Sequence, residues 1–402
     1  MTRRSALRVA MFIVWLPVTL AAAAEPKLVE EKRIFPAGDQ GWNIPGMLWC
    51  WVMRLSPDGK HLLYTRELPA ADPQPPEERE RREPSRQLRL RDLESGKEVS
   101  LPLDPIPDGW TTVYTRFNFF DPAGRTLALP VVARTEERRI ATGGARLTSV
   151  RRTMRLVLYD VAAGKVTKTA LEAGNLMAKF DRTGRGLVLC KDMMIHTASL
   201  PELKLTGLGA TGYPNSICPT ADVAVLFVPP SRTVRPREGA RPERPRSKLM
   251  LHDLRADKPL AELPSEEPSS NWDDWECQWT SDGRYLYYPG AKKDTVQTPQ
   301  GPRQRTATLS LVWDRLAGRQ VHVIDAAVAV GPGPTPTSMV LCGLKDEPKG
   351  VFLHDAATGQ RWTLEPGAKA QHARGGKVVY TRASPDGAAA YVARIAMPTA
   401  AQ

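Results

Sequence analysis

The hydrophobic positions of this chain fall in short runs separated by turn residues, a pattern typical of β-strands. One recurring unit is an apolar run, a tight turn and a second apolar run. Its copies lie at 54–64, 119–125, 179–185, 218–222 and 278–284. In the first copy Pro57 presets a backbone dihedral angle, Asp58 caps the turn, and Gly59 supplies a positive φ. Each copy therefore predicts a β-hairpin.

A second unit is an alternating strand that ends in Asp and is followed by a turn, in most copies with Gly. Its five copies end at Asp92, Asp160, Asp253, Asp314 and Asp355. We interpret these aspartates as caps of the turn backbone rather than as calcium ligands or acid–base catalysts. Two hairpins per repeat make a four-stranded antiparallel sheet, which is one blade of a propeller.

The repeats together predict an all-β fold, a β-propeller with seven four-stranded blades; six or eight blades are the alternatives. The blades begin near Trp49, Val113, Asn175, Asn215, Trp275, Ala327 and Ala368. The last repeat is short, and residues 28–35 form an extra strand near the N-terminus. We predict that this N-terminal strand closes the last blade and removes an exposed sheet edge. Proline supplies 36 of 402 residues, which disfavours long helices.

Residues 1–24 precede the repeats and differ from them in composition. Arginines at 3, 4 and 8 are followed by an apolar run over 9–20 and by alanines up to Ala24. This order is typical of a secretory signal peptide, and the run is shorter than the ~20 residues of a spanning helix. The arginine pair leaves both the Sec and the twin-arginine route open. We expect residues 25–402 to form a single, monomeric propeller domain, periplasmic or secreted, with no transmembrane segment after signal removal.

The turns Ser56–Lys60 and Ser281–Arg284 resemble the WD40-like repeats of the TolB-type β-propellers, and the resemblance covers nearly all of residues 28–397. It implies a propeller fold of the kind found in periplasmic protein-binding propellers. The same fold forms the gating domain of prolyl-oligopeptidase-like peptidases and the body of certain metal-dependent pectin-fragment lyases. This sequence has no Gly-x-Ser-x-Gly motif and no His-x-His pair, so neither kind of catalytic site is evident.

Nearly all of the positive charge lies in four insertions, at 69–86, 134–152, 229–248 and 291–306. They carry +11, whereas residues 25–402 carry +9 in total. Each insertion follows the second strand of its repeat, so we expect four loops on one face of the ring. Such a surface attracts anionic partners; the alternative is that the loops only solubilise the protein. We expect a protein or an anionic glycan or envelope component as partner. We do not expect nucleic acid, because the loops lack interleaved aromatic residues.

Aromatic and polar residues recur just before the innermost strands, on the same face as the insertions. They are Trp42, Asn43, Trp110, Tyr213, Asn215, Trp272, Asp273 and Asp274. Rings beside polar groups in a funnel can stack on sugars or anchor a peptide, and we predict that these residues bind the ligand. The alternative is that the rings fill the channel or pack between blades. Trp49, Trp51, Trp275 and Trp279 lie within strands and are expected in the core.

Residues suited to catalysis are few. His252 and His354 share one repeat position with Arg91 and Tyr159, so we interpret them as structural. The cysteines at 50, 190, 218, 277 and 342 form no CxxC pair, and we expect buried free thiols, with one disulfide as the alternative. We predict no metal, no cofactor and no catalytic residue, hence a non-catalytic binding module. The alternative is a lyase or hydrolase of an anionic polysaccharide that uses Asp273 or Asp274 as general acid or base.

Overall fold

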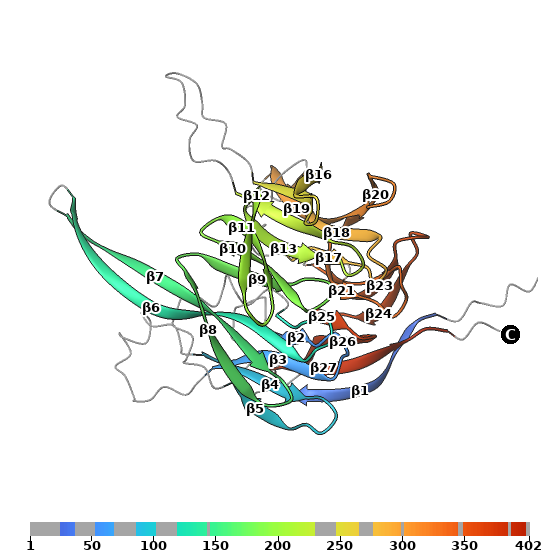
Figure 1. Ribbon diagram of the computed structural model, residues 1–402. Coiled ribbons are helices and arrows are strands. Elements are labelled where there is room, and N and C mark those ends of the chain that lie inside the picture. Colours follow the sequence, from blue (N-terminus) through green and yellow to red (C-terminus); the bar gives the residue numbers. More distant parts are fainter. Residues whose placement is uncertain are drawn as a thin grey trace, which may run out of the picture.

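The computed structural model describes residues 25–36, 53–67, 86–101, 119–142, 145–229, 247–264, 276–298, 301–344, 349–384 and 387–398. The strands in these residues form seven antiparallel sheets, and no described residue is helical (Figure 1). The first strands of neighbouring blades contact one another, for example β2 (Met53–Leu55) and β25 (Lys369–Arg374), so these strands form the inner wall of the ring. The seven-bladed propeller predicted from the repeats is therefore confirmed.

Six blades are four-stranded sheets, and the second has three strands and one bridge, Phe120 to Leu127. Blade 1 holds β2, β3 (His61–Glu67), β4 (Arg86–Asp92) and β5 (Glu98–Ser100), and blade 2 holds β6 (Thr126–Thr142), β7 (Ala145–Asp160) and β8 (Lys165–Ala173). Blade 3 holds β9 (Leu176–Phe180), β10 (Gly186–Lys191), β11 (Met194–Ser199) and β12 (Lys204–Thr211). Blade 4 holds β13 (Tyr213–Ile217), β14 (Val223–Val228), β15 (Lys248–Asp253) and β16 (Lys258–Glu262). Blade 5 holds β17 (Gln278–Trp279), β18 (Tyr285–Thr298), β19 (Gly301–Asp314) and β20 (Arg319–Asp325). Blade 6 holds β21 (Ala327–Pro332), β22 (Ser338–Gly343), β23 (Gly350–Asp355) and β24 (Arg361–Pro366), and blade 7 holds β25, β26 (Lys377–Ser384), β27 (Gly387–Ala396) and β1 (Lys27–Phe35).

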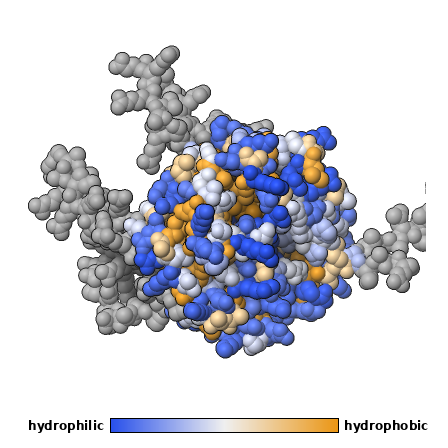
Figure 2. Space-filling model, in the orientation of Figure 1, coloured by the Kyte–Doolittle hydropathy of each residue, from blue (hydrophilic) through white to orange (hydrophobic). Residues whose placement is uncertain are grey.

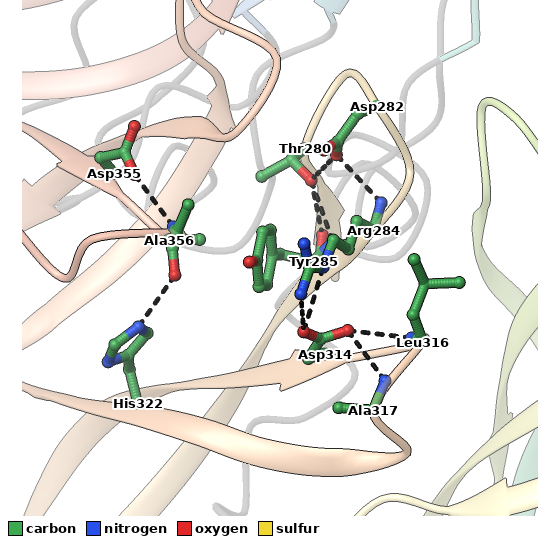
Figure 3. A network of polar contacts seen from close by, with 11 residues as sticks. Thr280, Asp282, Arg284, Tyr285, Asp314, Leu316, Ala317, His322, Asp355 and Ala356 are labelled. Carbon is green, nitrogen blue, oxygen red and sulfur yellow. Dashed lines mark hydrogen bonds and ion pairs between the residues drawn. The ribbon is translucent and has the colours of Figure 1, made fainter.

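The turns after the inner strands have the chemistry that the first repeat unit predicts. In blade 5, Thr280 Oγ1 donates to Asp282 Oδ1 over 2.6 Å, and the N–H of Arg284 donates to the same carboxylate oxygen over 3.0 Å (Figure 3). Gly283 has a φ of +66°, and a Cβ there would lie 2.2 Å from Thr220 Oγ1 of blade 4. Glycine is therefore required both by the turn and by the close approach of two blades.

The five repeated aspartates cap turns, as predicted. Asp314 Oδ1 accepts the N–H groups of Leu316 and Ala317 at 2.9 and 3.1 Å, while its Oδ2 accepts from Arg284 at 2.8 Å (Figure 3). The other four accept from backbone N–H groups two or three residues further along: Asp92, Asp160, Asp253 and Asp355. These bonds satisfy turn donors that a sheet ladder leaves open.

The N-terminal strand closes the last blade, as predicted. Strand β1 pairs antiparallel with β27, from Lys27 opposite Ala396 to Phe35 opposite Ala390. It also reaches blade 1, because Lys32 Nζ donates to the C=O of Leu93 over 2.8 Å. Strand β1 thus joins the first and last blades.

Two of the four insertions expected as loops are strands instead. The backbone of 134–152 continues β6 and β7 in a long two-stranded hairpin that projects from the body (Figure 1), and 291–306 continues β18 and β19 in the same way. Such a hairpin satisfies its own backbone hydrogen bonds without a core, so a polar composition does not prevent it. Residues 70–85 and 230–246, the bulk of the other two insertions, lie outside the described residues.

The core lies between neighbouring blades. Val225 and Leu251 of blade 4 pack with Leu286 and Tyr288 of blade 5, and each is at most 2% exposed. Similar clusters occupy other blade-to-blade interfaces, so each sheet buries both faces against its neighbours. This packing leaves the inner strands fixed around the axis of the ring.

Candidate functional site

One backbone hydrogen bond recurs in the blades and defines equivalent positions on the inner strands. The N–H of Ser56 donates to the C=O of His61, and an equivalent bond is made in blades 2 to 6 by Asp121, Asp181, Cys218, Thr280 and Gly333. Two residues before each of these donors stand Arg54, Phe119, Lys179, Ser216, Gln278 and Gly331. Arg54 and Lys179 are cationic, although they lie on the innermost strands.

A pocket of about 200 Å³ lies beside these positions, at the end of the channel where the inner strands enter their turns. We name this end the turn end. Residues of blades 1 to 5 and 7 line the pocket, among them Pro57, Phe120, Lys179, Ser216, Glu276 and Arg374. Because six blades contribute, the pocket lies on the axis of the ring.

The pocket contains a buried ion pair. Lys179 Nζ bonds Glu276 Oε1, and the two side chains are only 7% and 9% exposed. The other oxygen, Oε2, accepts from Gln278 Nε2 over 3.3 Å. Asp181 also lines the pocket, but its Oδ1 accepts the backbone N–H of Thr183 at 2.9 Å and serves the turn.

The charge of Glu276 also acts on two guanidinium groups, those of Arg54 and Arg374. Burial lowers the pKa of both Arg54 and Arg374, and the Glu276 carboxylate opposes this shift in each. Burial also lowers the pKa of Lys179, against the attraction of Glu276. The charge of Glu276 therefore acts on three buried cations, in a place where water solvates them poorly.

His372, on β25, marks the strength of this positive field. Its Nδ1 accepts the N–H of Leu55 over 3.0 Å, which ties blade 7 to blade 1. Burial, together with the charges of Arg54, Arg374 and Lys179, holds the pKa of His372 well below its usual range, so its imidazole is neutral. Among the described residues, its Nε2 and the Nε of Arg374 have no hydrogen-bond partner.

This arrangement is suited to binding an anionic group. Buried cations are stable only when a carboxylate, a phosphate or a similar group pairs with them. Glu276 pairs with Lys179, and its charge also acts on Arg54 and Arg374. An anion that enters the pocket from the turn end would meet Lys179 and Arg374, which both line it.

Six of the eight predicted ligand-binding residues lie outside the described residues: Trp42, Asn43, Trp110, Trp272, Asp273 and Asp274. The other two have contacts within the fold. The Tyr213 hydroxyl accepts from Asn175 Nδ2 over 2.6 Å, and Asn215 is 3% exposed and accepts the N–H of Cys277 over 2.7 Å. Both lie on β13, and neither lines the pocket at the turn end. Ligand binding by the eight residues stays a prediction.

Most other side chains considered for chemistry have structural partners. His252 and His354 are each 4% exposed, and they contact Asp257 and Tyr287 at 3.0 and 2.6 Å. Four cysteines are buried free thiols, at 190, 218, 277 and 342, while Cys50 lies outside the described residues. Trp279 is 5% exposed, in the core as expected. Within the described ranges, no three His, Cys, Asp or Glu residues are grouped as a metal site, and no helix is long and apolar enough to cross a membrane.

Arg54, Lys179, Glu276 and Arg374 were not among the residues predicted from the sequence. Outside the four insertions the positive and negative charges nearly balance, so the total charge does not reveal these buried cations. The signal was nevertheless present, because Arg54 and Lys179 occupy the same position relative to their turns. On the face shown in Figure 2, hydrophilic residues cover much of the described surface.

Comparison with known proteins finds solved structures that are similar to this chain at low sequence identity. No family model matches the chain, and no curated protein matches it. Among solved structures, TolB from Acinetobacter baumannii is similar, with 12% identity, a TM-score of 0.34, and coverage of 84% of this chain and 81% of TolB. An oligogalacturonate lyase in complex with manganese has 12% identity, a TM-score of 0.47 and coverage of 93% and 98%. The β-propeller domain of the trilobed protease from Pyrococcus furiosus has 11% identity, a TM-score of 0.37 and coverage of 94% and 85%.

Proposed function

We propose that this chain is an exported, non-catalytic binding module that holds an anionic segment of a partner protein at the turn end of its channel. The observation that carries the proposal is the pocket on the ring axis, which Lys179 and Arg374 line together with the buried carboxylate of Glu276. Export rests on the signal-like sequence of residues 1–24, which lie outside the described residues.

The lining of the pocket favours a peptide over a sugar chain. Pro57, Pro122 and Pro219 come from three different turns, and Phe120 and Phe180 stand beside them. Apolar walls with a few charged groups suit a peptide that offers both an acidic group and apolar side chains. The alternative, a lyase or hydrolase of an anionic polysaccharide, depends on Asp273 or Asp274, which lie outside the described residues.

Site-specific photo-cross-linking in the native cell envelope tests the proposal. A photoreactive amino acid replaces Pro57 or Pro219 at the turn end. Met194 is replaced in the same way as the control, because it is 42% exposed and begins β11, the third strand of blade 3, at the opposite end of the channel. We expect both turn-end positions to cross-link one protein, which then binds the purified chain, and Met194 to give no such product.

Two other results would contradict the proposal. Cross-linking from Met194 alone would place the partner at the other end of the channel. If no position captures a protein that binds the purified chain, the module does not bind a protein, and turnover of acidic oligosaccharides becomes the measurement to make. N-terminal sequencing of the exported chain tests the signal peptide, with Glu25 as the expected first residue.

A further inference from the structure

The charged side chains of the pocket differ in whether they have a hydrogen-bonding partner. Among the described residues, those that line it are Lys179, Asp181, Arg182, Glu276 and Arg374. Lys179 bonds Glu276. Arg182 Nε donates to Asp222 Oδ1 over 2.7 Å, and Asp181 Oδ1 accepts the N–H of Thr183 over 2.9 Å. Each of these four charged groups therefore has a partner, which leaves Arg374 to be accounted for.

The guanidinium of Arg374 has a buried donor that the described part of the chain does not satisfy. Its Nε is enclosed and has no hydrogen-bond partner among the described residues. Burial lowers the pKa of Arg374, and Glu276 opposes this shift through its charge and not through a hydrogen bond. A guanidinium offers its N–H donors in a planar fork that matches the two oxygens of a carboxylate. A carboxylate that enters the pocket would therefore complete the contacts of Arg374.

The backbone that carries Arg374 is held firmly in place. Arg374 is the last residue of β25, and the turn that follows it packs against blade 1. Gly375 has a φ of +55°, and a Cβ there would lie 2.7 Å from the carbonyl carbon of Asp58. Lys377 Nζ donates to the C=O of Gly59 over 3.0 Å. A donor on a fixed backbone loses less freedom when it binds a ligand, which favours binding.

The size and the walls of the pocket suit one residue of a peptide. Its volume of about 200 Å³ is below the roughly 300–1,000 Å³ of small-molecule sites. Pro57, Pro122 and Phe180 line it together with Arg374. A C-terminal residue carries its carboxylate and its side chain on the same Cα, so a single residue can contact both the guanidinium and the apolar walls. An internal Asp or Glu would bring the carboxylate without a side chain for the walls.

The buried ion pair favours the end of a peptide over a peptide that passes through the channel. Lys179 lies in blade 3 and Glu276 precedes β17 of blade 5, so their bond spans the ring past blade 4. Their side chains are only 7% and 9% exposed. A chain that runs along the axis would have to separate this pair, which is costly in a buried place. A chain end has only to enter the pocket.

We propose that the pocket binds the C-terminus of a partner polypeptide, with the terminal carboxylate on the guanidinium of Arg374. The last side chain of the partner is apolar or aromatic and packs against Pro57, Pro122 and Phe180. The inference rests on the proposed function, since it names the part of the partner protein that enters the turn end.

Affinity selection from two peptide libraries tests this. Both libraries hold N-terminally acetylated heptapeptides of random sequence; one ends in a free carboxylate and the other in an amide. Residues 25–402 are immobilised, retained peptides are identified by mass spectrometry, and the best is titrated by calorimetry. We expect the free-acid library to give peptides that end in an apolar or aromatic residue. Amidation of the selected peptide should weaken its binding about tenfold, the value of a hydrogen bond to a charged group.

Two variants locate the effect at Arg374. Arg374→Gln should bind the selected peptide about tenfold more weakly, whereas the amidated peptide should bind it and the wild type equally. Arg182→Gln removes the same charge from the pocket lining, but Arg182 already pairs with Asp222, so this control should bind as the wild type does. Circular dichroism and thermal melting check folding. If Arg374→Gln does not fold, Arg374→Lys keeps the charge without the fork and should also bind the free acid more weakly.

Three results would overturn the inference. They are retention of no peptide from the free-acid library, equal binding of the acid and the amide, and selection of amidated peptides through an internal Asp or Glu. In each case the proposed function is still decided by cross-linking from Pro57 and Pro219. If free-acid peptides bind through Arg374 but neither position cross-links a protein, the C-terminus site stands and the proposed function is wrong.

Discussion

At the scale of single residues, turn chemistry could be read from the sequence and pocket chemistry could not. Asp58 or Asp314 acts on backbone groups two or three residues away, so local spacing suffices to predict its role. Lys179 and Glu276 are 97 residues apart and meet only because blades 3 and 5 converge on the axis. Their pairing depends on ring geometry, and a local pattern cannot contain it.

His354 provides a prediction for pH dependence. Burial, helped by nearby His322 and Arg361 and opposed by Asp355, lowers the pKa of His354 to about 4. The unfolded chain binds a proton at this residue below about pH 6.5, whereas the folded chain does so only below about pH 4. The contribution of His354 to the stability of the fold is therefore complete above pH 6.5 and is lost as the pH falls toward 4.

His354→Gln should remove this dependence while keeping an acceptor for the Tyr287 hydroxyl, which contacts His354 Nδ1 at 2.6 Å. Urea unfolding between pH 7 and pH 4 should show the wild type losing about 3 kcal/mol more than the variant. Above pH 7 the two proteins should have parallel stability curves. Equal losses of stability below pH 6.5 would show that His354 is protonated in the folded ring.

At the scale of elements, the number and order of strands followed from the repeats, including the closing strand at the N-terminus. The long hairpins at β6–β7 and β18–β19 were not predicted, because the polar, charged composition of these insertions suggested loops. Two strands that pair only with each other need turns and backbone hydrogen bonds rather than an apolar face. The dipeptide Gly143–Gly144, between paired Thr142 and Ala145, was the local sign of such a hairpin.

Strand β1 is predicted to hold the ring closed. Ile34 and Phe35 are 4% and 2% exposed, and the Phe35 ring lies 4.8 Å from that of Tyr64 in blade 1. Deletion of 25–36 should therefore lower the free energy of unfolding by about 3–6 kcal/mol, the value of two buried apolar side chains. It should also expose the edge of β27 and promote self-association.

Urea denaturation and size-exclusion chromatography of residues 37–402, compared with residues 25–402, measure both effects. An Ile34→Ala variant is the matched control, because it loses apolar burial but keeps the β1–β27 pairing. It should be destabilised and stay monomeric. A shortened chain as stable and as monomeric as residues 25–402 would mean that blade 7 does not need β1.

At the scale of the whole molecule, the propeller separates the basic insertions from the charges of the pocket. In an up-and-down blade, the turn after the inner strand and the connection after the second strand lie at opposite ends. Lys179 and Arg374 line the turn end, whereas the connections that follow the second strands, where the sequence carries its basic insertions, belong to the other end. Charge in this chain therefore acts in two ways: screened by solvent at one end and enclosed at the other.

The two kinds of charge should differ in the kinetics of partner binding. Residues 230–246 carry a net charge of +4, and replacing them with a Gly-Ser segment of equal length should slow association about tenfold at low salt. At 0.5 M salt the difference should disappear, because exposed charges are screened within a few ångströms. Lys179→Met should instead raise the dissociation rate at both salt concentrations, since its side chain is enclosed.

Surface plasmon resonance with the protein cross-linked at Pro57 measures both rates. Trp42→Ala, Trp110→Ala and Trp272→Ala extend the comparison to the other end of the channel. If they raise the dissociation rate as Lys179→Met does, the partner spans the channel and both sets of residues bind it. If they alone do so and Lys179→Met does not, the predicted aromatic funnel is the binding site and the turn end is not.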